Sequence, residues 1–190
     1  LQKEKNNTIK ELQKKIGIGI VIKQDISENQ VKPIYLGIGS NLGNKRKNIE
    51  NTKFYLLKND IDILETSSYY ESLSWPNHKN PKFLNIVVKI QTSFTPQKLI
   101  KKCKEIEIEL GRKKLPKNSP RVCDIDIIDF RGQKMSNGLI LPHPRMHTRN
   151  FVLLPLFEIA KDWKHPILKL NIKKLISFLS NSDIRSIKQI

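Results

Sequence analysis

The segment RVCDIDIIDF, residues 121–130, has the apolar composition of a buried strand but carries two aspartates two positions apart. On an extended chain, residues i and i+2 point to the same side. Asp124 and Asp126 therefore share one face, while Cys123 and Ile125 occupy the other. Like charges this close repel each other unless something positive lies between them. A metal ion, a cluster of arginines or exposure to water would each relieve the repulsion, and the segment alone leaves the three open.

Arginines gather around this segment. The chain has 35 Lys and Arg against 18 Asp and Glu, a formal net charge of +17, and its lysines are spread along the whole length. Most of the arginines, by contrast, fall within one stretch: Arg112, Arg121, Arg131, Arg145 and Arg149. A strongly basic protein can bind nucleic acid. Because the planar guanidinium binds phosphate oxygens in pairs, the clustering instead predicts a small phosphorylated ligand.

Length and composition favour one globular domain with flanking segments. The chain has 190 residues, and none of its apolar runs approaches the roughly 18 residues that cross a membrane. Cys103 and Cys123 lack zinc-site spacing and are expected to be reduced, buried thiols of a cytoplasmic protein. The first residue is not Met, which suggests a piece of a longer polypeptide. We expect an N-terminal extension or linker (1–33), a compact domain (34–166) and a C-terminal helix, tail or linker to a further domain (167–190).

Strand-like and helix-like patterns alternate along the chain and predict an α+β fold, a mostly antiparallel sheet flanked by helices. The segments expected to form strands are 16–24, 34–38, 61–71, 83–92, part of 121–130 and 139–142. The segments expected to form helices are 44–57, 95–111, 150–160 and 172–179. The Gly-rich turn after 34–38 matches neither common phosphate-loop spacing, so a tight strand-to-helix turn is expected there.

For two of the expected helices, the sequence indicates where the helix ends or which face is buried. In 95–111, Thr95 is a suitable N-cap and Gly111 a suitable stop. The residues expected on its buried stripe are Leu99, Cys103, Ile106 and Leu110. The residues expected on the apolar face of 44–57 are Ile49, Phe54 and Leu57.

The strand FLNIVVKIQT, residues 83–92, has two unlike faces. Leu84, Ile86 and their alternate successors form one apolar face, whereas Phe83 and Asn85 belong to the other. An amide beside an aromatic ring indicates that this second face meets something other than the core. A surface Phe with an edge-facing Asn is the alternative.

The aspartates have a plausible metal partner. Mg²⁺ takes one or two protein carboxylates and completes its octahedron with phosphate oxygens and water. Asp124 and Asp126, surrounded by cations, would suit such a site, and an internal ion-pair network is the alternative. His143, between two prolines, would either donate to a phosphate oxygen or pack on the surface.

Several ordered motifs resemble one family. They are YLGIGSNLG (35–43), SSYYES (67–72), FLN (83–85), ELGR (109–112), PRVCDIDIIDF (120–130), LPHPRM (141–146) and RNFVLLPLFEIA (149–160). Together they resemble 6-hydroxymethyl-7,8-dihydropterin pyrophosphokinase, an enzyme of folate biosynthesis. The resemblance implies a ferredoxin-like α/β sandwich that transfers pyrophosphate from ATP to the pterin hydroxymethyl group and releases AMP.

The resemblance also implies roles for individual positions. Asp124 and Asp126 would hold two Mg²⁺ ions on the triphosphate of ATP. The other residues implied at the nucleotide or the transferring group are Glu107, Arg112, Lys114, Lys117, Arg121, Ile127, His143 and Arg149. Phe83 and Phe151 would sandwich the pterin, and Asn85 would bind its edge. The segment that would complete the pterin pocket contains Ser72, Leu73 and Trp75.

The chain departs from the family at a few positions. Lys114 stands where arginine is more usual, and Asn118 replaces a tryptophan of well-known members. The loops 112–121 and 71–82 are expected to become ordered only with both substrates. Residues 1–30 resemble the end of dihydroneopterin aldolase, and a dihydropteroate synthase domain after residue 190 would suit the same pathway, so a covalent fusion is expected.

Two other functions compete with this one. An RNA-binding module would explain the charge, but the chain lacks the aromatic strand motif that stacks bases. Another metal-dependent nucleotidyl- or phosphotransferase would use the same aspartates. We expect small-molecule partners, ATP and a pterin, and neither a nucleic acid nor a membrane.

Overall fold

The computed structural model describes residues 32–116 and 118–190, so the strand expected at 16–24 and the candidate ligand Lys117 lie outside the described residues. The strands are β1 (Ile34–Ser40), β2 (Asp62–Thr66), β3 (Tyr70–Ser72), β4 (Phe83–Gln91), β5 (Asp124–Phe130) and β6 (Ile187–Gln189). They form one sheet in the order β5-β1-β4-β3-β6, with β2 also on β4, and all these pairings are antiparallel. The expected α+β class with a mostly antiparallel sheet is confirmed.

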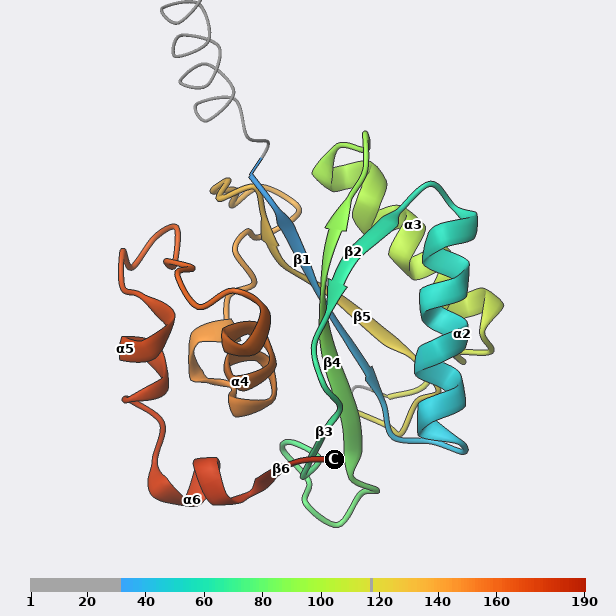
Figure 1. The fold of residues 1–190 in the computed structure, drawn as a ribbon. Coiled ribbons are helices and arrows are strands. Elements are labelled where there is room, and N and C mark those ends of the chain that lie inside the picture. Colours follow the sequence, from blue (N-terminus) through green and yellow to red (C-terminus); the bar gives the residue numbers. More distant parts are fainter. Residues whose placement is uncertain (1–31, 117) are drawn as a thin grey trace, which may run out of the picture. The chain divides into compact units, whose positions relative to one another are not determined.

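Helices cover both faces of this sheet (Figure 1). They are α2 (Lys45–Lys58), α3 (Pro96–Glu109), α4 (Asn150–Ile159), α5 (Ile172–Ile176) and α6 (Asn181–Arg185), with a short 3₁₀ turn at Met146–Thr148. α2 and α3 lie on one face, and α4 and α5 lie on the other. Each side has its own apolar core, so the sheet is buried on both faces.

β4 confirms the two faces expected from its sequence. Its alternate residues Leu84, Ile86, Val88 and Ile90 lie in the core under α2 and α3. Val87 lies in the core on the α4 side. Phe83 and Asn85 share the face of Val87 because side chains alternate along a strand. At that end of the strand they face a cavity rather than a core.

α3 also confirms its expected ends. The side chain of Thr95 accepts a hydrogen bond from the backbone N–H of Lys98, and Gly111 has a φ of 91° just beyond the helix. This left-handed conformation favours glycine. Leu99, Cys103 and Ile106 are fully buried, as expected. The helix therefore holds its last turn, next to β5, in a fixed position.

α2 forms where expected but buries a different face. Phe54 and Leu57 are 62% and 52% exposed, so their expected place in the core is wrong. The buried residues are Ile49, Thr52 and Leu56. At 100° per residue these three lie within one narrow arc, which Phe54 and Leu57 do not share. Thr52 tolerates burial because its hydroxyl donates to the Asn48 carbonyl oxygen at 2.8 Å.

Three expectations for strands and helices need correction. The single strand expected at 61–71 is divided into β2 and β3. Residues 139–142 form no strand, only an isolated bridge between Met135 and Leu141, and Pro142 has no N–H with which to extend it. The helix expected at 172–179 ends at Ile176.

The C-terminal residues join the sheet. β6 pairs with β3, a pairing that the sequence did not predict, and it extends the edge beside Ser72. Within the described part of the chain, none of the helices has both the length and the apolar character that crossing a membrane requires.

Candidate active site

A cavity of about 760 Å³ lies over β1, β4 and β5, bounded by the loop 111–122 and the start of α4. Most of the residues selected from the sequence line it. They are Ser72, Leu73, Trp75, Phe83, Asn85, Arg112, Arg121, Asp124, Asp126, His143, Arg149 and Phe151.

Strand register sets the floor of this cavity. Gly39 of β1 pairs with Asp124 of β5 on one side and with Asn85 of β4 on the other, and Gly37 pairs with Asp126. Neighbouring strands are about 4.8 Å apart, so the backbones of Asp124 and Asn85 are separated by about 10 Å. Gly39 lies between Asp124 and Asn85, and Gly37 lies beside Asp126. Because neither glycine has a side chain, they leave an open strip along β1, which we call the glycine trough.

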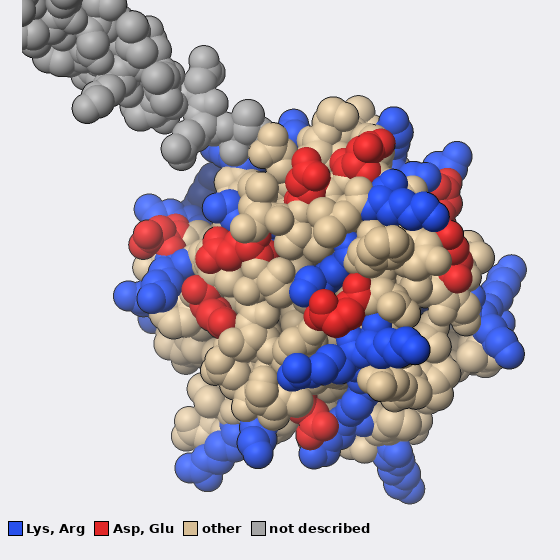
Figure 2. Space-filling model, turned by 45° about the vertical axis from the view of Figure 1, so that its right-hand side comes forward, with Lys and Arg blue, Asp and Glu red and all other residues tan. Residues whose placement is uncertain are grey.

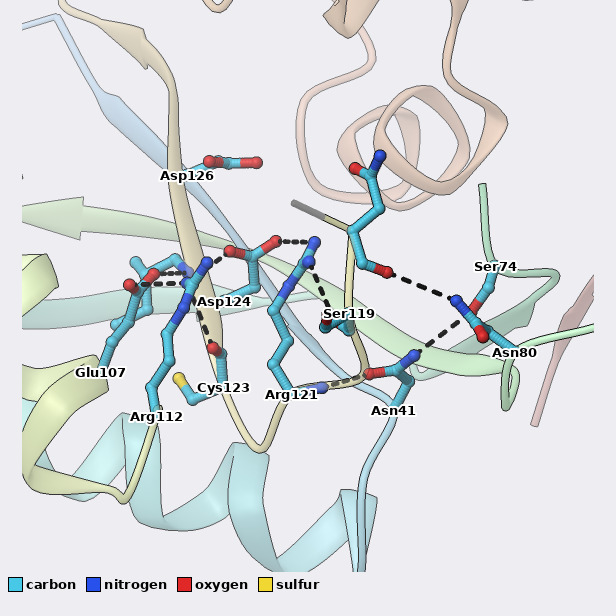
Figure 3. Close-up of polar contacts among 12 residues, drawn as sticks. Asn41, Ser74, Asn80, Glu107, Arg112, Ser119, Arg121, Cys123, Asp124 and Asp126 are labelled. Carbon is cyan, nitrogen blue, oxygen red and sulfur yellow. Dashed lines mark hydrogen bonds and ion pairs between the residues drawn. The ribbon is translucent and has the colours of Figure 1, made fainter. Parts of the chain in front are cut away.

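Two arginines hold Asp124 (Figure 3). Arg112 Nη1 donates to Oδ1 and Arg121 Nη2 donates to Oδ2, both at 2.7 Å. Burial by itself would raise the pKa of Asp124, but the guanidinium groups of Arg121 and Arg112 outweigh burial and hold that pKa below its usual value. Asp124 is therefore an anion at neutral pH, neutralised here by arginines.

Asp126 is held more loosely. It stands apart from the arginine pair on Asp124 in Figure 3. His143 Nε2 and Arg149 Nη1 each lie 3.9 Å from its Oδ2, beyond hydrogen-bond distance. The side chain of Asp126 is 41% exposed, against 19% for Asp124. The two carboxylates thus lie on the same face of β5, but Asp126 is more accessible to a ligand than Asp124.

The imidazole of His143 has the protonation that lets Nε2–H donate a hydrogen bond into the cavity. Burial lowers its pKa, and the neighbouring carboxylate of Asp126 offsets this only in part. Its Nδ1 accepts the backbone N–H of Arg145 at 3.2 Å. A neutral imidazole with an accepting Nδ1 carries its proton on Nε2. That N–H, on the side of Asp126, suits a phosphate oxygen.

Glu107 supports the site from beneath without lining the cavity. It is buried at the end of α3, and its oxygens contact Lys104 Nζ at 2.8 Å and Arg112 Nη1 at 2.6 Å. The backbone N–H of Ile125 donates to it at 2.7 Å. Burial raises the pKa of Glu107, and Lys104 opposes that effect. The guanidinium of Arg112 is consequently fixed between two carboxylates, those of Glu107 and Asp124.

The other half of the cavity is aromatic and amide-lined. Asn85 is buried, and its Nδ2 donates to Ser72 Oγ at 2.9 Å. A Cβ atom added at Gly39 would lie 2.8 Å from Asn85 Oδ1 and 3.4 Å from Phe83 Cδ1. Glycine at this position therefore lets the amide lie against β1, with its edge available to a planar ligand.

An arginine lies over each of three aromatic rings at the cavity. The Cζ atom of Arg121 is 5.2 Å from the centre of the Phe83 ring. The corresponding distances are 5.3 Å from Arg149 to Phe151 and 5.3 Å from Arg145 to Trp75. These cation–π distances connect the charged half of the cavity with the aromatic half.

The donor set suits magnesium. Among residues 32–116 and 118–190, no group of three or more His, Cys, Asp or Glu side chains could hold a metal ion. Asp124 and Asp126 are the two carboxylates that line the cavity within those residues. Mg²⁺ commonly takes one or two carboxylates together with phosphate and water, whereas a structural zinc site needs four protein ligands.

Comparison with known proteins identifies the family. Residues 35–161 match the family model described as 7,8-dihydro-6-hydroxymethylpterin-pyrophosphokinase (HPPK). The chain belongs to the HPPK family. This membership makes the matched residues an ATP-dependent pyrophosphokinase domain that acts on 6-hydroxymethyl-7,8-dihydropterin in folate synthesis.

Relatives of HPPK occur alone and within longer proteins. The chain is 37% identical over 142 residues to the 2-amino-4-hydroxy-6-hydroxymethyldihydropteridine pyrophosphokinase of Aquifex aeolicus, covering 74% of this chain and 88% of that protein. It is 39% identical over 165 residues to the folic acid synthesis protein fol1 of Pneumocystis carinii, covering 85% of this chain. It spans only 22% of that protein and 22% of the Dictyostelium discoideum FOL1 protein.

A solved structure shares the fold. The wild-type Plasmodium falciparum HPPK-DHPS structure matches with a TM-score of 0.64 at 18% identity, over 86% of this chain and 45% of that one. At this identity the likeness supports the HPPK fold and nothing more specific.

Among the residues that the structure describes, Glu107, Lys114 and Ile127 are implied by the HPPK resemblance but do not line the cavity. Glu107 acts through Arg112 and Ile125, as described above. The side chain of Ile127 lies in the core on the far side of the sheet, because it alternates with the aspartates. Ile127 could therefore contact a nucleotide only through its backbone. Lys114 is an exposed loop residue, and its role stays a prediction.

Some contributors to the HPPK cavity were not selected from the sequence. Gly37 and Gly39 form its floor, and the signal for them is their i, i+2 spacing within a strand, which marks a close approach to one face. Asn41 supports the loops around the cavity. No periodicity or motif chemistry distinguishes Asn41 from other turn residues.

Proposed function

We propose that this HPPK domain holds ATP and the pterin side by side along the glycine trough. The observation that carries the proposal is the strand register, which sets Asp124 and Asn85 about 10 Å apart with a glycine between them. Carboxylates for a metal thus face a phosphate chain at one side of the trough. An amide and two phenylalanine rings face a flat heterocycle at the other side.

The charged side would organise the triphosphate. Asp124 and Asp126 would hold Mg²⁺, two ions in the arrangement implied by the resemblance, and Mg²⁺ bound there would neutralise charge on the phosphate oxygens. Arg112 and Arg121 would bind phosphates with their planar groups. These side chains line the cavity within hydrogen-bond reach of Asp124.

The transferring group would be reached from the side of α4. Arg149, near the start of that helix, and His143 both face Asp126. The Nε2–H of His143 would donate to a phosphate oxygen without needing a second proton. Arg149 would stabilise the charge that spreads over the phosphoryl oxygens as the bond to the leaving AMP lengthens.

The aromatic side would orient the pterin. Phe83 and Phe151 would stack against its two faces, and Asn85 would match its donor–acceptor edge. Ser72 fixes the Asn85 amide by accepting from Nδ2. Positioning and charge neutralisation would supply most of the rate enhancement.

The test is AMP release from ATP that depends on both Mg²⁺ and 6-hydroxymethyl-7,8-dihydropterin. Asp126→Asn should reduce the rate about 100-fold or more while the protein stays folded, because preorganised charge at the transition state is lost. Asp62→Asn, the same change at an exposed position of β2, is the matched control and should leave the rate unchanged. Wild-type rates for Asp126→Asn would overturn the proposal.

We also propose that the domain works within a longer, multifunctional polypeptide in the cytoplasm. Support comes from the folic acid synthesis relatives, of which the chain spans about a fifth, and from solved neighbours named HPPK-DHPS. The two buried free cysteines suit a reducing compartment. The mass of the endogenous protein, detected by an antibody against this domain in a cell fractionation, tests both statements.

A further inference from the structure

Asp124 and Asp126 lie on the same face of β5 but are unequally accessible to a metal. Both oxygens of Asp124 accept guanidinium hydrogen bonds at 2.7 Å. The cations beside Asp126 stand 3.9 Å away. A divalent ion therefore meets an open carboxylate at Asp126 and an occupied one at Asp124.

The arginines oppose a metal at Asp124 in two ways. Each takes lone-pair positions on an oxygen that a metal would use. Each also places a positive charge within a few ångströms of the position that the divalent ion would occupy, and like charges at that distance repel strongly in a partly buried site. For Asp124 to accept a metal, at least one guanidinium has to move.

The two arginines differ in what else holds them. Arg112 also pairs with Glu107 at 2.6 Å and donates to the Cys123 carbonyl oxygen at 3.3 Å, so it is anchored on both sides. Besides Asp124, Arg121 reaches only the Ser119 carbonyl oxygen, at 3.4 Å, among the hydrogen bonds of its guanidinium to described residues. Its buried Nε finds no hydrogen-bond partner within residues 32–116 and 118–190. Of the two, Arg121 is therefore the arginine whose guanidinium can leave Asp124 for another hydrogen-bond partner.

A polyphosphate supplies the partner that Arg121 lacks. Its oxygens carry more negative charge than one carboxylate and accept the forked guanidinium in pairs. Arg121 lines the cavity in which the phosphates would lie. Transfer of Arg121 from Asp124 to a phosphate would free the carboxylate when the nucleotide arrives.

We propose that Arg121 is a positioning residue that keeps a divalent cation off Asp124 until a polyphosphate draws its guanidinium away. The proposal rests on the proposed function, because it assigns the polyphosphate to ATP. Its consequence is that the complete metal site forms together with nucleotide binding and not before it. Arg121 then has opposite effects on the free metal and on the metal–nucleotide complex.

The experiment is a Mn²⁺ titration, followed by electron paramagnetic resonance, on protein without nucleotide. Arg121→Gln should bind Mn²⁺ about tenfold more tightly than wild type, which corresponds to about 1.4 kcal/mol. Arg145→Gln removes the same charge from the same cavity, but Arg145 lies over Trp75 and not on Asp124. It should change the affinity much less.

Two further variants locate the effect. The gain should vanish when Asp124→Asn is added to Arg121→Gln, because the freed carboxylate is then absent. Arg121→Lys, which keeps the charge but loses the fork, should fall between wild type and Arg121→Gln. Arg121→Lys also keeps the test valid if Arg121→Gln does not fold.

With Mn²⁺ and a non-hydrolysable ATP analogue the order should reverse, and Arg121→Gln should bind the metal–nucleotide complex more weakly than wild type. Equal nucleotide-free Mn²⁺ affinities of wild type and Arg121→Gln, or a gain that survives Asp124→Asn, would overturn the proposal. AMP release by the wild-type protein is measured separately. Absence of AMP release would contradict the proposed function, whereas unchanged Mn²⁺ affinity of Arg121→Gln would contradict only the role of Arg121 at Asp124.

Discussion

The side-chain oxygen of Asn41 accepts a 2.7 Å hydrogen bond from the backbone N–H of Arg121, a residue 80 positions later in the chain. The Nδ2 of the same buried amide donates to Ser74 Oγ and to the Pro81 carbonyl oxygen, each at 3.2 Å. One side chain at the end of β1 thus connects the two loops that border the cavity. Asn41 fixes the backbone from which Arg121 reaches Asp124 (Figure 3).

Asn41→Ala should lower the free energy of unfolding by about 2–4 kcal/mol, because it removes three hydrogen bonds and leaves the Arg121 N–H without its acceptor. Ser74 Oγ and the Pro81 carbonyl oxygen keep the hydrogen bond to each other. Urea denaturation measures the change. Asn59→Ala removes a single side-chain hydrogen bond, from Asn59 Nδ2 to the Tyr55 carbonyl oxygen at a partly exposed helix end. It should lower the free energy of unfolding by about 1 kcal/mol or less. Similar losses for the two variants would contradict the connecting role of Asn41.

Gly39→Ala should weaken pterin binding more than ATP binding. The added methyl group would lie 2.8 Å from Asn85 Oδ1, so the amide has to move and lose its bond to Ser72. We expect the Kd for the pterin to rise about tenfold or more, as for a displaced buried hydrogen-bonding group. Calorimetry with each ligand measures both affinities.

Gly37→Ala is the comparison for this change. There the new atom meets the flexible end of Ile128 at 3.3 Å and no amide. If Gly39→Ala and Gly37→Ala weakened pterin binding to the same extent, the assigned contact between Asn85 and the pterin would be wrong.

Glu107→Gln should reduce activity mainly through the nucleotide, although Glu107 lies outside the cavity. The neutral amide would leave Arg112 held less firmly beneath Asp124. Breaking a buried ion pair by changing one partner costs about 3–5 kcal/mol, so we expect reduced stability and a higher KM for ATP. Thermal denaturation and steady-state kinetics measure these effects.

The matched control lies two residues earlier on the same helix. Glu105 also forms an i, i+3 ion pair, with Lys102 at 2.6 Å, but the Glu105 side chain is 46% exposed, against 2% for Glu107. Water screens an ion pair at the surface, so Glu105→Gln should resemble wild type. A Glu107→Gln variant that also resembles wild type would remove Glu107 from the site.

Stability should depend on the protonation of His165. Its ring is buried, and burial, reinforced by His147, lowers its pKa to about 4 from an ordinary value near 6.5. Between these two values the unfolded chain binds the proton and the folded chain does not. Folding stability should therefore fall as the pH drops from about 6.5 to about 4, by an amount on the order of 3 kcal/mol.

His165→Gln should remove this part of the pH dependence, since Nδ1 of His165 serves as an acceptor for the N–H groups of Ile167 and Leu168, which a Gln carbonyl oxygen can replace. Urea denaturation of wild type and variant at pH 7 and pH 5 gives the difference. Exposed His78→Gln serves as the control. Equal slopes for wild type and His165→Gln would show that another group carries the dependence.

Basic side chains are distributed differently on the face shown in Figure 2 and at the cavity. On the face shown in Figure 2, Lys and Arg side chains are spread out, with Asp and Glu side chains among them. Of the five arginines that the sequence singled out, Arg112, Arg121, Arg145 and Arg149 line the cavity. Arg131 does not, and donates instead to the Thr92 carbonyl oxygen at 2.8 Å. The expectation of clustered arginines directed at one ligand agrees with this arrangement.

Sequence was sufficient for the features set by local chemistry. The carboxylate face of β5, the two faces of β4 and the capped helix α3 follow from alternation and end signals. The sequence was insufficient where contacts between residues far apart in the chain decide which side chains are buried and which strands pair. Phe54 is apolar yet exposed because the core meets Thr52 and Leu56 instead, and β6 exists because the exposed edge of β3 accepts it.

The site follows the same division. Residue types identified Asp124, Asp126, Phe83 and Phe151, which line one cavity, as candidates for metal and pterin binding. The partners of each charge depend on the folded arrangement. Arg112 lies between Asp124 and Glu107, and no spacing in the sequence reveals that. The role of Asn41 likewise depends on two loops far away along the chain.

The glycine trough also has a thermodynamic consequence. Glycine loses more conformational entropy on folding than alanine, about 0.5–1 kcal/mol inside a strand. At Gly39, however, a Cβ atom would lie 2.8 Å from Asn85 Oδ1, so alanine recovers this free energy only if the amide moves. The space beside Gly39 is therefore already taken by Asn85, and relief of the entropy cost at this glycine requires both positions to change.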